Sequence, residues 1–145
     1  MPVKHRIHTK SGLFFITFTC YRWLPLIAQT NGYDFIYRWF DYVKSQGHFI
    51  NGYVIMPNHV HLLITFVRAS QPVNTIIGNG KRFMAYTIIQ RLKEMQQTGL
   101  LQQLQDSVET SRKANNKQHN VWEQSFDWKE CTGIAFTWQK LDYIH

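Results

Sequence analysis

Two histidines separated by one residue are the most distinctive chemical feature of the sequence. His59 and His61 lie in the apolar stretch Tyr53–Phe66 (YVIMPNHVHLLITF), directly after Pro57 and Asn58. Because side chains alternate between the two faces of a strand, both imidazoles should point the same way. Two neighbouring imidazoles on a rigid strand can hold one divalent metal ion, although the same spacing is also typical of polar residues on a half-open sheet.

The residues around the pair predict a β-hairpin. The Pro57-Asn58 break separates two apolar runs, Phe49–Met56 and His59–Phe66, in the pattern of a strand, a tight turn and a second strand. The alternate positions of the second run are all apolar: Val60, Leu62, Ile64 and Phe66. The hairpin would therefore offer one face to a core and leave the histidine face for a site.

Length and composition predict one globular domain. The 145 residues, 44% hydrophobic and 15% aromatic, suffice for a real core. No apolar run approaches a membrane span and no signal-peptide pattern is present, so we expect a cytoplasmic protein with no membrane partner. Only two cysteines, Cys20 and Cys131, argue against a disulfide framework. A net charge of +7 is compatible with binding a phosphate backbone.

The remaining periodicity predicts the rest of an α+β fold. The expected elements are a strand at Leu13–Tyr21, a helix at Thr30–Gln46, the hairpin, a helix at Gln71–Gln97, a strand at Val121–Trp128 and a terminal helix at Cys131–His145. This order is that of a ferredoxin-like, RRM-like βαββαβ unit with an additional C-terminal helix. Its four-stranded antiparallel sheet would carry helices on one face and the histidine pair on the other.

Residue spacing also predicts details of the helices. Thr30 or Asn31 is expected to cap the first helix, and Gly78–Gly80 to make the start of the second one irregular. Lys81 and Arg82 are expected on or near its solvent side. The buried stripe of the second helix is expected to comprise Phe83, Tyr86, Ile89 and Leu92.

A metal ion beside a basic surface points to phosphodiester chemistry, which needs a nucleophile. Seven tyrosines are candidates. In a helical projection Tyr143 falls roughly 180° from Ile134, away from the apolar stripe of the terminal helix. Tyr86 falls instead on the expected buried stripe of the second helix. The projection favours Tyr143, and Lys140 nearby could favour its phenolate.

Two blocks resemble the HUH (His-hydrophobe-His) single-tyrosine transposases, most closely the REP-associated form. The first is Met56–Ile64 (MPNHVHLLI), and the second is Lys140–His145 (KLDYIH), in which the tyrosine of the family pattern falls on Tyr143. The likeness extends over most of the chain, from about Leu13 to His145.

This resemblance implies a metal-dependent endonuclease and strand transferase acting on single-stranded or hairpin DNA. Tyr143 would attack a phosphodiester to give a 5′-phosphotyrosine intermediate, and His59 and His61 would hold Mg²⁺ or Mn²⁺. Family members act as monomers or homodimers, and either state is expected here. The basic residues expected to contact DNA are Lys81, Arg82, Arg112, Lys113 and Lys117.

The sequence departs from the family pattern at its end, because the Asn-Pro that follows the tyrosine region is absent after His145. In the family, a side chain one turn beyond the tyrosine often helps bind the metal. We therefore expect residues 1–145 to form a single HUH domain lacking the family's C-terminal end, with weak or no cleavage. Glu123, Gln124 and His119 are weak substitutes as ligands.

Two other classes of protein stay open. One is a non-catalytic nucleic-acid-binding domain, either a degenerate transposase or an RRM-like module, although the aromatic consensus of the RNA-recognition motif is missing. The other is a structural domain in which the two histidines bind zinc, although no further Cys or His ligand occurs at a zinc spacing.

Overall fold

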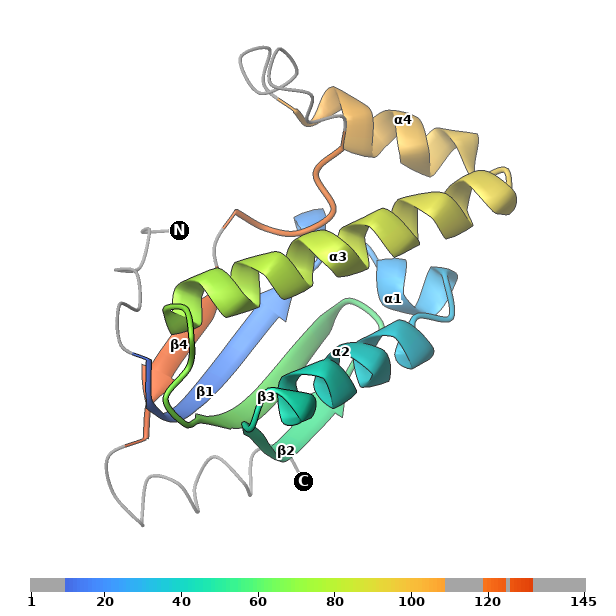
Figure 1. The fold of residues 1–145 in the computed structure, drawn as a ribbon. Coiled ribbons are helices and arrows are strands. Elements are labelled where there is room, and N and C mark those ends of the chain that lie inside the picture. Colours follow the sequence, from blue (N-terminus) through green and yellow to red (C-terminus); the bar gives the residue numbers. More distant parts are fainter. Residues whose placement is uncertain (1–9, 109–118, 125, 132–145) are drawn as a thin grey trace.

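A computed structural model describes residues 10–108, 119–124 and 126–131 of the chain. Its elements are β1 (Gly12–Thr19), the short 3₁₀ turn η1 (Tyr21–Trp23), α1 (Leu26–Gln29), α2 (Tyr33–Ser45), β2 (Phe49–Ile55), β3 (His59–Phe66), α3 (Val73–Glu94), α4 (Thr98–Asp106) and β4 (Asp127–Glu130). Helices α2 and α3 cover one face of the sheet, and α4 packs on α3 (Figure 1). The predicted α+β class is confirmed. No helix in the described ranges has both the length and the apolar character that crossing a membrane requires.

The four strands form one antiparallel sheet in the order β2-β3-β1-β4. The predicted hairpin is correct to within one residue at its outer strand, and β1 lies inside the sheet between β3 and β4. One residue, Asn51, bulges out of β2 between Ile50 and Gly52, and its side-chain oxygen accepts a bond from Thr65 (2.6 Å). The bulge adjusts the outer strand without disturbing the pairing of β3 with β1.

The core lies between the sheet and the helices, and we call this side of the sheet the helix face. Alternate side chains of β1 and β3 point to it and are almost fully buried: Phe14, Ile16, Phe18, Val60, Leu62, Ile64 and Phe66. Helix α2 contributes a stripe at helical spacing: Phe35, Ile36, Trp39, Phe40 and Val43. The apolar face predicted for β3 is therefore confirmed.

The start of α2 differs from the prediction. The Thr30 hydroxyl donates to the Leu26 carbonyl (2.7 Å), so it closes α1 instead of capping α2. Asn31 adopts a left-handed conformation (φ 50°), and Gly32 precedes the first helical residue without a side-chain cap. A short polar side chain can bond either to the helix that follows it or to the turn that precedes it, and Thr30 bonds to the preceding turn.

Helix α3 also corrects the prediction, because it runs unbroken through Gly78–Gly80 and turns a different face to the core. Phe83 and Tyr86 are 69% and 68% exposed, so the predicted buried stripe is wrong at these two positions, and burial no longer argues against Tyr86 as a nucleophile. Leu92 is buried and Ile89 packs against the core, as predicted. The buried residues are Val73, Ile77, Gly80, Lys81, Met84, Ile88 and Leu92.

The interior position of Lys81 explains part of this rotation. The side chain is 8% exposed, and its ammonium donates to the Glu123 carbonyl (3.2 Å) beside the Phe126 ring (5.8 Å). The prediction that Lys81 lies on or near the solvent side of the helix is therefore wrong. A hydrophobic pattern counts neither lysine nor glycine as interior, which is why it assigned Phe83 and Tyr86 to the buried face.

The fourth strand starts later than predicted. Asp127–Glu130 pairs with β1, whereas Trp122 forms only an isolated bridge with Cys20 and donates its indole N–H to the Lys81 carbonyl (2.8 Å). Burial raises the pKa of the Cys20 thiol to about 12. The predicted terminal helix lies, apart from Cys131, outside the described residues.

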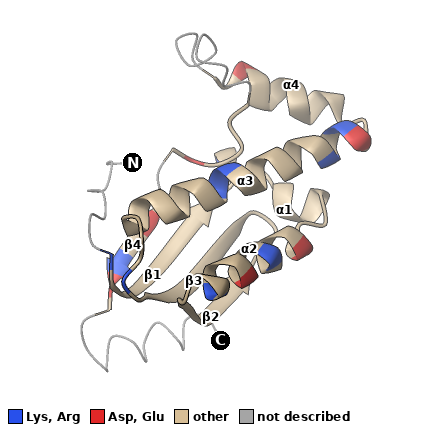
Figure 2. Ribbon diagram, viewed as in Figure 1, with Lys and Arg blue, Asp and Glu red and all other residues tan. Residues whose placement is uncertain are grey.

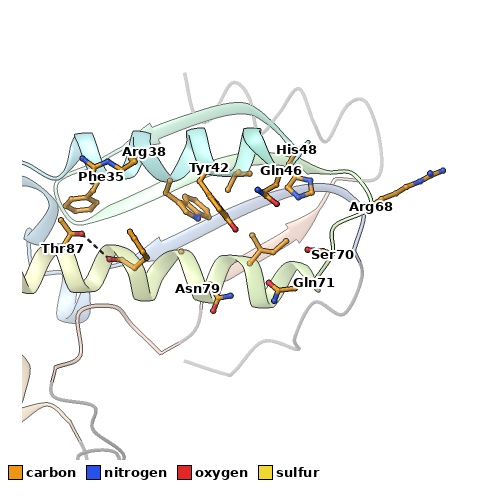
Figure 3. Close-up of a pocket in the computed structure, with 15 residues that line it drawn as sticks. Phe35, Arg38, Tyr42, Gln46, His48, Arg68, Ser70, Gln71, Asn79 and Thr87 are labelled. Atoms are coloured by element: carbon orange, nitrogen blue, oxygen red, sulfur yellow. Dashed lines mark hydrogen bonds between the residues drawn. The ribbon is translucent and has the colours of Figure 1, made fainter.

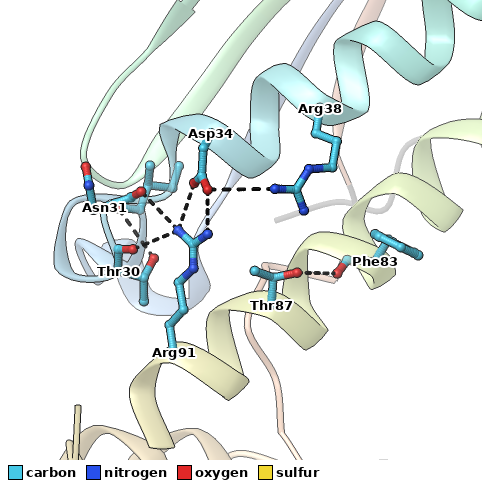
Figure 4. Close-up of polar contacts among 8 residues, drawn as sticks. Thr30, Asn31, Asp34, Arg38, Phe83, Thr87 and Arg91 are labelled. Carbon is cyan, nitrogen blue, oxygen red and sulfur yellow. Dashed lines mark hydrogen bonds and ion pairs between the residues drawn. The ribbon is translucent and has the colours of Figure 1, made fainter. Parts of the chain in front are cut away.

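Arg91 ties α3 to the connection between α1 and α2 (Figure 4). Its guanidinium binds both carboxylate oxygens of Asp34 (2.6 and 2.8 Å) and donates to the carbonyls of Thr30 and Asn31 (3.1 Å each). It also lies 5.2 Å from the Phe35 ring. The hydrogen bonds from Arg91 lower the pKa of the Asp34 carboxyl from 3.8 to about 2.

Replacing Gly80 by alanine should destabilise the fold, because a Cβ there would lie 2.5 Å from Cε2 and 2.9 Å from Cζ2 of the Trp39 indole. We expect a loss of about 1–3 kcal/mol in the free energy of unfolding, measured by denaturant titration. Gly78 in the same helix is the control, since a Cβ there meets nothing within 4 Å. Gly78→Ala should stabilise by roughly 0.5–1 kcal/mol, and equal effects of the two changes would refute the close-approach argument.

Asp34→Asn should lower the melting temperature slightly at neutral pH, because it removes one charge of the Asp34–Arg91 pair. Since the folded state depresses the pKa of Asp34, the carboxylate contributes its stability above about pH 4 and loses it as the pH falls through about 2. The pair is exposed to solvent, so its contribution should stay below about 1 kcal/mol. Melting curves of both proteins across this pH range should converge at the acid end, and a constant gap would contradict the assignment.

Candidate metal and nucleic-acid site

His59 and His61 lie on the side of the sheet opposite the helix face, which we call the histidine face. Their ring centroids are 4.7 Å apart and the rings are nearly perpendicular, at 79°. The intervening Val60 is fully buried on the helix face. The expectation that both imidazoles point the same way is confirmed, whereas their role as metal ligands stays a prediction.

Asn58 fixes the orientation and the tautomer of His59. The Asn58 amide nitrogen donates to the Trp23 carbonyl (3.3 Å), which turns its oxygen towards Nδ1 of His59 (2.7 Å). An amide oxygen only accepts hydrogen bonds, so Nδ1 carries the proton and the lone pair of the neutral ring lies on Nε2. Burial lowers the pKa of His59 below its usual 6.5. The ring is therefore neutral at pH 7, which is the state that binds a metal.

His61 is oriented by the neighbouring strand. Its Nδ1 is 2.8 Å from the hydroxyl oxygen of Thr17, the residue directly opposite it on β1. Its ring stacks on Phe15 at 5.7 Å and 16°. Phe15 belongs with Leu63 to a small apolar cluster on the histidine face, so the imidazole rests on packed side chains. Partners of this kind hold metal-binding histidines in place in many sites.

Three residues beside the pair escaped sequence reasoning: Asn58, Thr17 and Trp23. Asn58 could have been found, because it precedes His59 directly and metal-binding histidines commonly donate their second ring N–H to a neighbouring oxygen acceptor. Thr17 could not have been found, because it contacts His61 only through the pairing of β1 with β3. Trp23 lies edge to face with His59 at 5.7 Å and gave no signal in the sequence.

The described residues supply two imidazoles and no complete protein cage. No three or more His, Cys, Asp or Glu within them form a group that could hold a metal ion. Glu123, one of the predicted substitutes, instead accepts a hydrogen bond from the Arg22 backbone (2.8 Å). Two imidazoles fit a divalent ion that completes its shell with water and phosphate oxygens. Nitrogen donors favour Mn²⁺ over Mg²⁺ in such a set.

Two of the other predicted site residues are described, Lys81 and Arg82, and both lie on α3, on the helix-covered side of the sheet away from the histidine pair (Figure 1). Lys81 is interior, and Arg82 is exposed on α3 with its guanidinium bound to Asn79 (3.1 Å). Strands β1, β2 and β3 carry no Lys, Arg, Asp or Glu, so the charges in the described ranges lie on the helices, on β4 and in connections (Figure 2). Four predicted residues fall outside the described ranges: Tyr143, Arg112, Lys113 and Lys117.

A pocket of about 540 Å³ lies on the other side of the sheet, between α2 and α3. Tyr42 and Arg38 border it from α2, and Asn79 and Thr87 from α3, while Arg68 extends outwards from its end (Figure 3). Neither His59 nor His61 lines this pocket. The sheet therefore separates it from the candidate metal site.

Comparison with known proteins gives a likeness in structure alone. No protein-family model matches the chain, and no curated protein matches it in sequence. A putative transposase from Deinococcus radiodurans R1 aligns with 99% of this chain and 95% of its own at 15% identity and a TM-score of 0.48. A REP-associated tyrosine transposase, solved bound to a REP hairpin, aligns with 99% of this chain and 70% of its own at 16% identity and a TM-score of 0.60. The chain therefore has the fold of a REP-associated tyrosine transposase, which confirms at the level of fold the resemblance seen in the sequence.

Proposed function

We propose that the chain is a DNA strand transferase of the single-tyrosine HUH type, acting on single-stranded or hairpin DNA. The observation that carries the proposal is the histidine pair, two adjacent imidazoles fixed on a rigid strand of a fold shared with a tyrosine transposase. That solved relative is bound to a REP hairpin, which supports hairpin DNA as the substrate class. The HVH block and the DYIH block of the sequence support the same assignment.

The histidine pair would bind the scissile phosphate through a divalent ion, Mg²⁺ or Mn²⁺. When bound, such an ion polarises a phosphoryl oxygen and offsets the charge that develops on it. His59 would contribute through Nε2, because Asn58 holds the proton on Nδ1. His61 would contribute from the position that Thr17 and Phe15 fix. Strand β3 then presents both ligands without rearrangement.

Tyr143 is the proposed nucleophile. Its phenolic oxygen would form a bond to phosphorus as the bond from phosphorus to the 3′ oxygen breaks. The phenol loses its proton and the departing 3′ oxygen gains one, which leaves a 5′-phosphotyrosine and a free 3′-hydroxyl. A second 3′-hydroxyl could reverse the step and so join a new strand. Both steps exchange one phosphodiester for another and need no energy source.

The architecture of the proposed enzyme is ferredoxin-like with an added tyrosine helix. The strand order β2-β3-β1-β4, with α2 and α3 on one face, supports the first part. The tyrosine helix is proposed from the sequence for residues 132–145. A monomer or a homodimer is compatible with this arrangement.

A hairpin-binding protein without cleavage activity is the alternative. It is favoured by the number of protein ligands, since the described residues offer only two imidazoles at the site. Such a protein would keep the fold and the nucleic-acid surface and would form no covalent intermediate.

Incubation of a form extended past His145 with labelled hairpin DNA and Mn²⁺ should give a covalent protein–DNA adduct on a denaturing gel, whereas the 145-residue form should give a weak adduct or none. Tyr143→Phe should abolish the adduct, because the attacking oxygen is gone, and His59→Ala or His61→Ala should reduce it at least about 100-fold. Tyr86→Phe is the matched control, since Tyr86 is an exposed tyrosine that should not matter for the adduct. If the adduct still forms with Tyr143→Phe and is lost with Tyr86→Phe, the nucleophile is Tyr86 on α3 and not Tyr143. No adduct with any protein would favour the non-catalytic alternative.

DNA binding should weaken as salt rises, because each phosphate contact releases counterions. The slope of log K against log salt is negative. Changing Arg112, Lys113 and Lys117 together to glutamine should reduce its magnitude by roughly 2 for single strands. Lys81→Gln is the control, because its buried ammonium is already bound to a carbonyl and should not contribute to the slope. A slope that is unchanged in the triple variant would remove this segment from the DNA surface.

A further inference from the structure

Trp23 stands out because it is 62% exposed directly beside the candidate site. Two other tryptophans in the described ranges, Trp39 and Trp122, are buried in the core. The Trp23 indole lies edge to face with His59 at 5.7 Å, and His59 in turn lies 4.7 Å from His61. An exposed indole therefore extends the row of rings on the histidine face towards solvent.

The backbone that presents this indole is strained. Arg22 (φ 51°) and Trp23 (φ 58°) are consecutive left-handed residues, and neither is glycine. Each such residue costs about 1–2 kcal/mol, so other contacts must hold the turn. An exposed apolar ring gains nothing from that strain in the isolated protein. Strain of this kind is common where a side chain must be presented to a ligand.

The contacts that hold the turn also hold the site. The Arg22 backbone N–H donates to the Glu123 carboxylate (2.8 Å), and the Trp23 N–H donates to the Cys20 carbonyl (2.9 Å). The Asn58 amide donates to the Trp23 carbonyl with its nitrogen and accepts from His59 with its oxygen. One side chain therefore fixes the position of the indole relative to the imidazole.

We infer that Trp23 is a stacking platform for one nucleobase of a single strand that crosses the histidine pair. This inference rests on the proposed function, because it places a phosphate of that strand at the pair. Unpaired bases expose flat faces that stack on aromatic side chains in a largely sequence-independent way. Arg22 is exposed on the same turn, and its guanidinium lies 5.4 Å from the Tyr21 ring, so the turn offers a positive charge beside the platform.

The test compares two probes of equal length and charge, oligothymidylate and a strand of abasic nucleotides. Trp23→Ala should weaken binding of oligothymidylate roughly ten- to hundred-fold and leave the abasic strand unaffected, because only the first offers bases to stack. Trp23→Phe should retain most of the affinity. The slope of log K against log salt should not change in either variant, because neither alters a charge.

Phe83→Ala is the matched control, since Phe83 is similarly exposed (69%) but lies on α3, on the helix-covered side of the sheet. It should leave both affinities unchanged. The inference is overturned if the Trp23→Ala variant binds both probes like the wild type, or if it loses affinity for both probes equally. It is also overturned if the wild-type protein binds neither probe. Base-dependent stacking without a covalent adduct would instead reject the catalytic proposal and leave the platform standing. An adduct that depends on the histidines, with no role for Trp23, would reject the platform and leave the catalytic proposal standing.

Discussion

The alternation of side chains along β3 is the constraint on which both the core and the candidate site depend. Val60 and Leu62 are fully buried on the helix face, and the histidines on either side of Val60 point the other way. A slip of one residue in pairing would bury both imidazoles and expose the apolar side chains. Burying each large apolar side chain is worth about 1.5–3 kcal/mol, so the core sets the register far more strongly than any contact of the histidines does. The site inherits its geometry from hydrophobic packing.

The hairpin was predictable from the sequence because a period of two is encoded directly in its residues. The face of α3 was predicted only in part, because the packing of this helix depends on a glycine, which has no side chain. Gly80 allows the Trp39 indole to reach the helix backbone, and Lys81 is interior because a carbonyl and an aromatic ring accept its ammonium. Neither effect is visible in a pattern of apolar residues. The cap of α2 was missed for a similar reason, since the Thr30 hydroxyl had two possible backbone partners.

For the candidate site, sequence reasoning found the two imidazoles and missed what surrounds them. The ring positions follow from the spacing of His59 and His61, but the Thr17 contact requires the pairing of β1 with β3. Trp23 is far from His59 in the chain. The two rings meet only because η1 folds back against the turn before β3, where the Asn58 amide donates a hydrogen bond to the Trp23 carbonyl. Long-range partners of this kind depend on tertiary structure, which local residue patterns do not encode.

The buried thiol of Cys20 has a practical consequence for chemical labelling. With a pKa of about 12, it is ionised to only about one part in ten thousand at pH 8, and alkylating reagents attack the thiolate. Cys131, half-buried against Phe15 and Leu63, lies just after β4 on the other side of the sheet. A maleimide dye would therefore modify Cys131 well before Cys20 without any mutation. The native sequence thus provides a single fluorophore position within the same apolar cluster that supports His61.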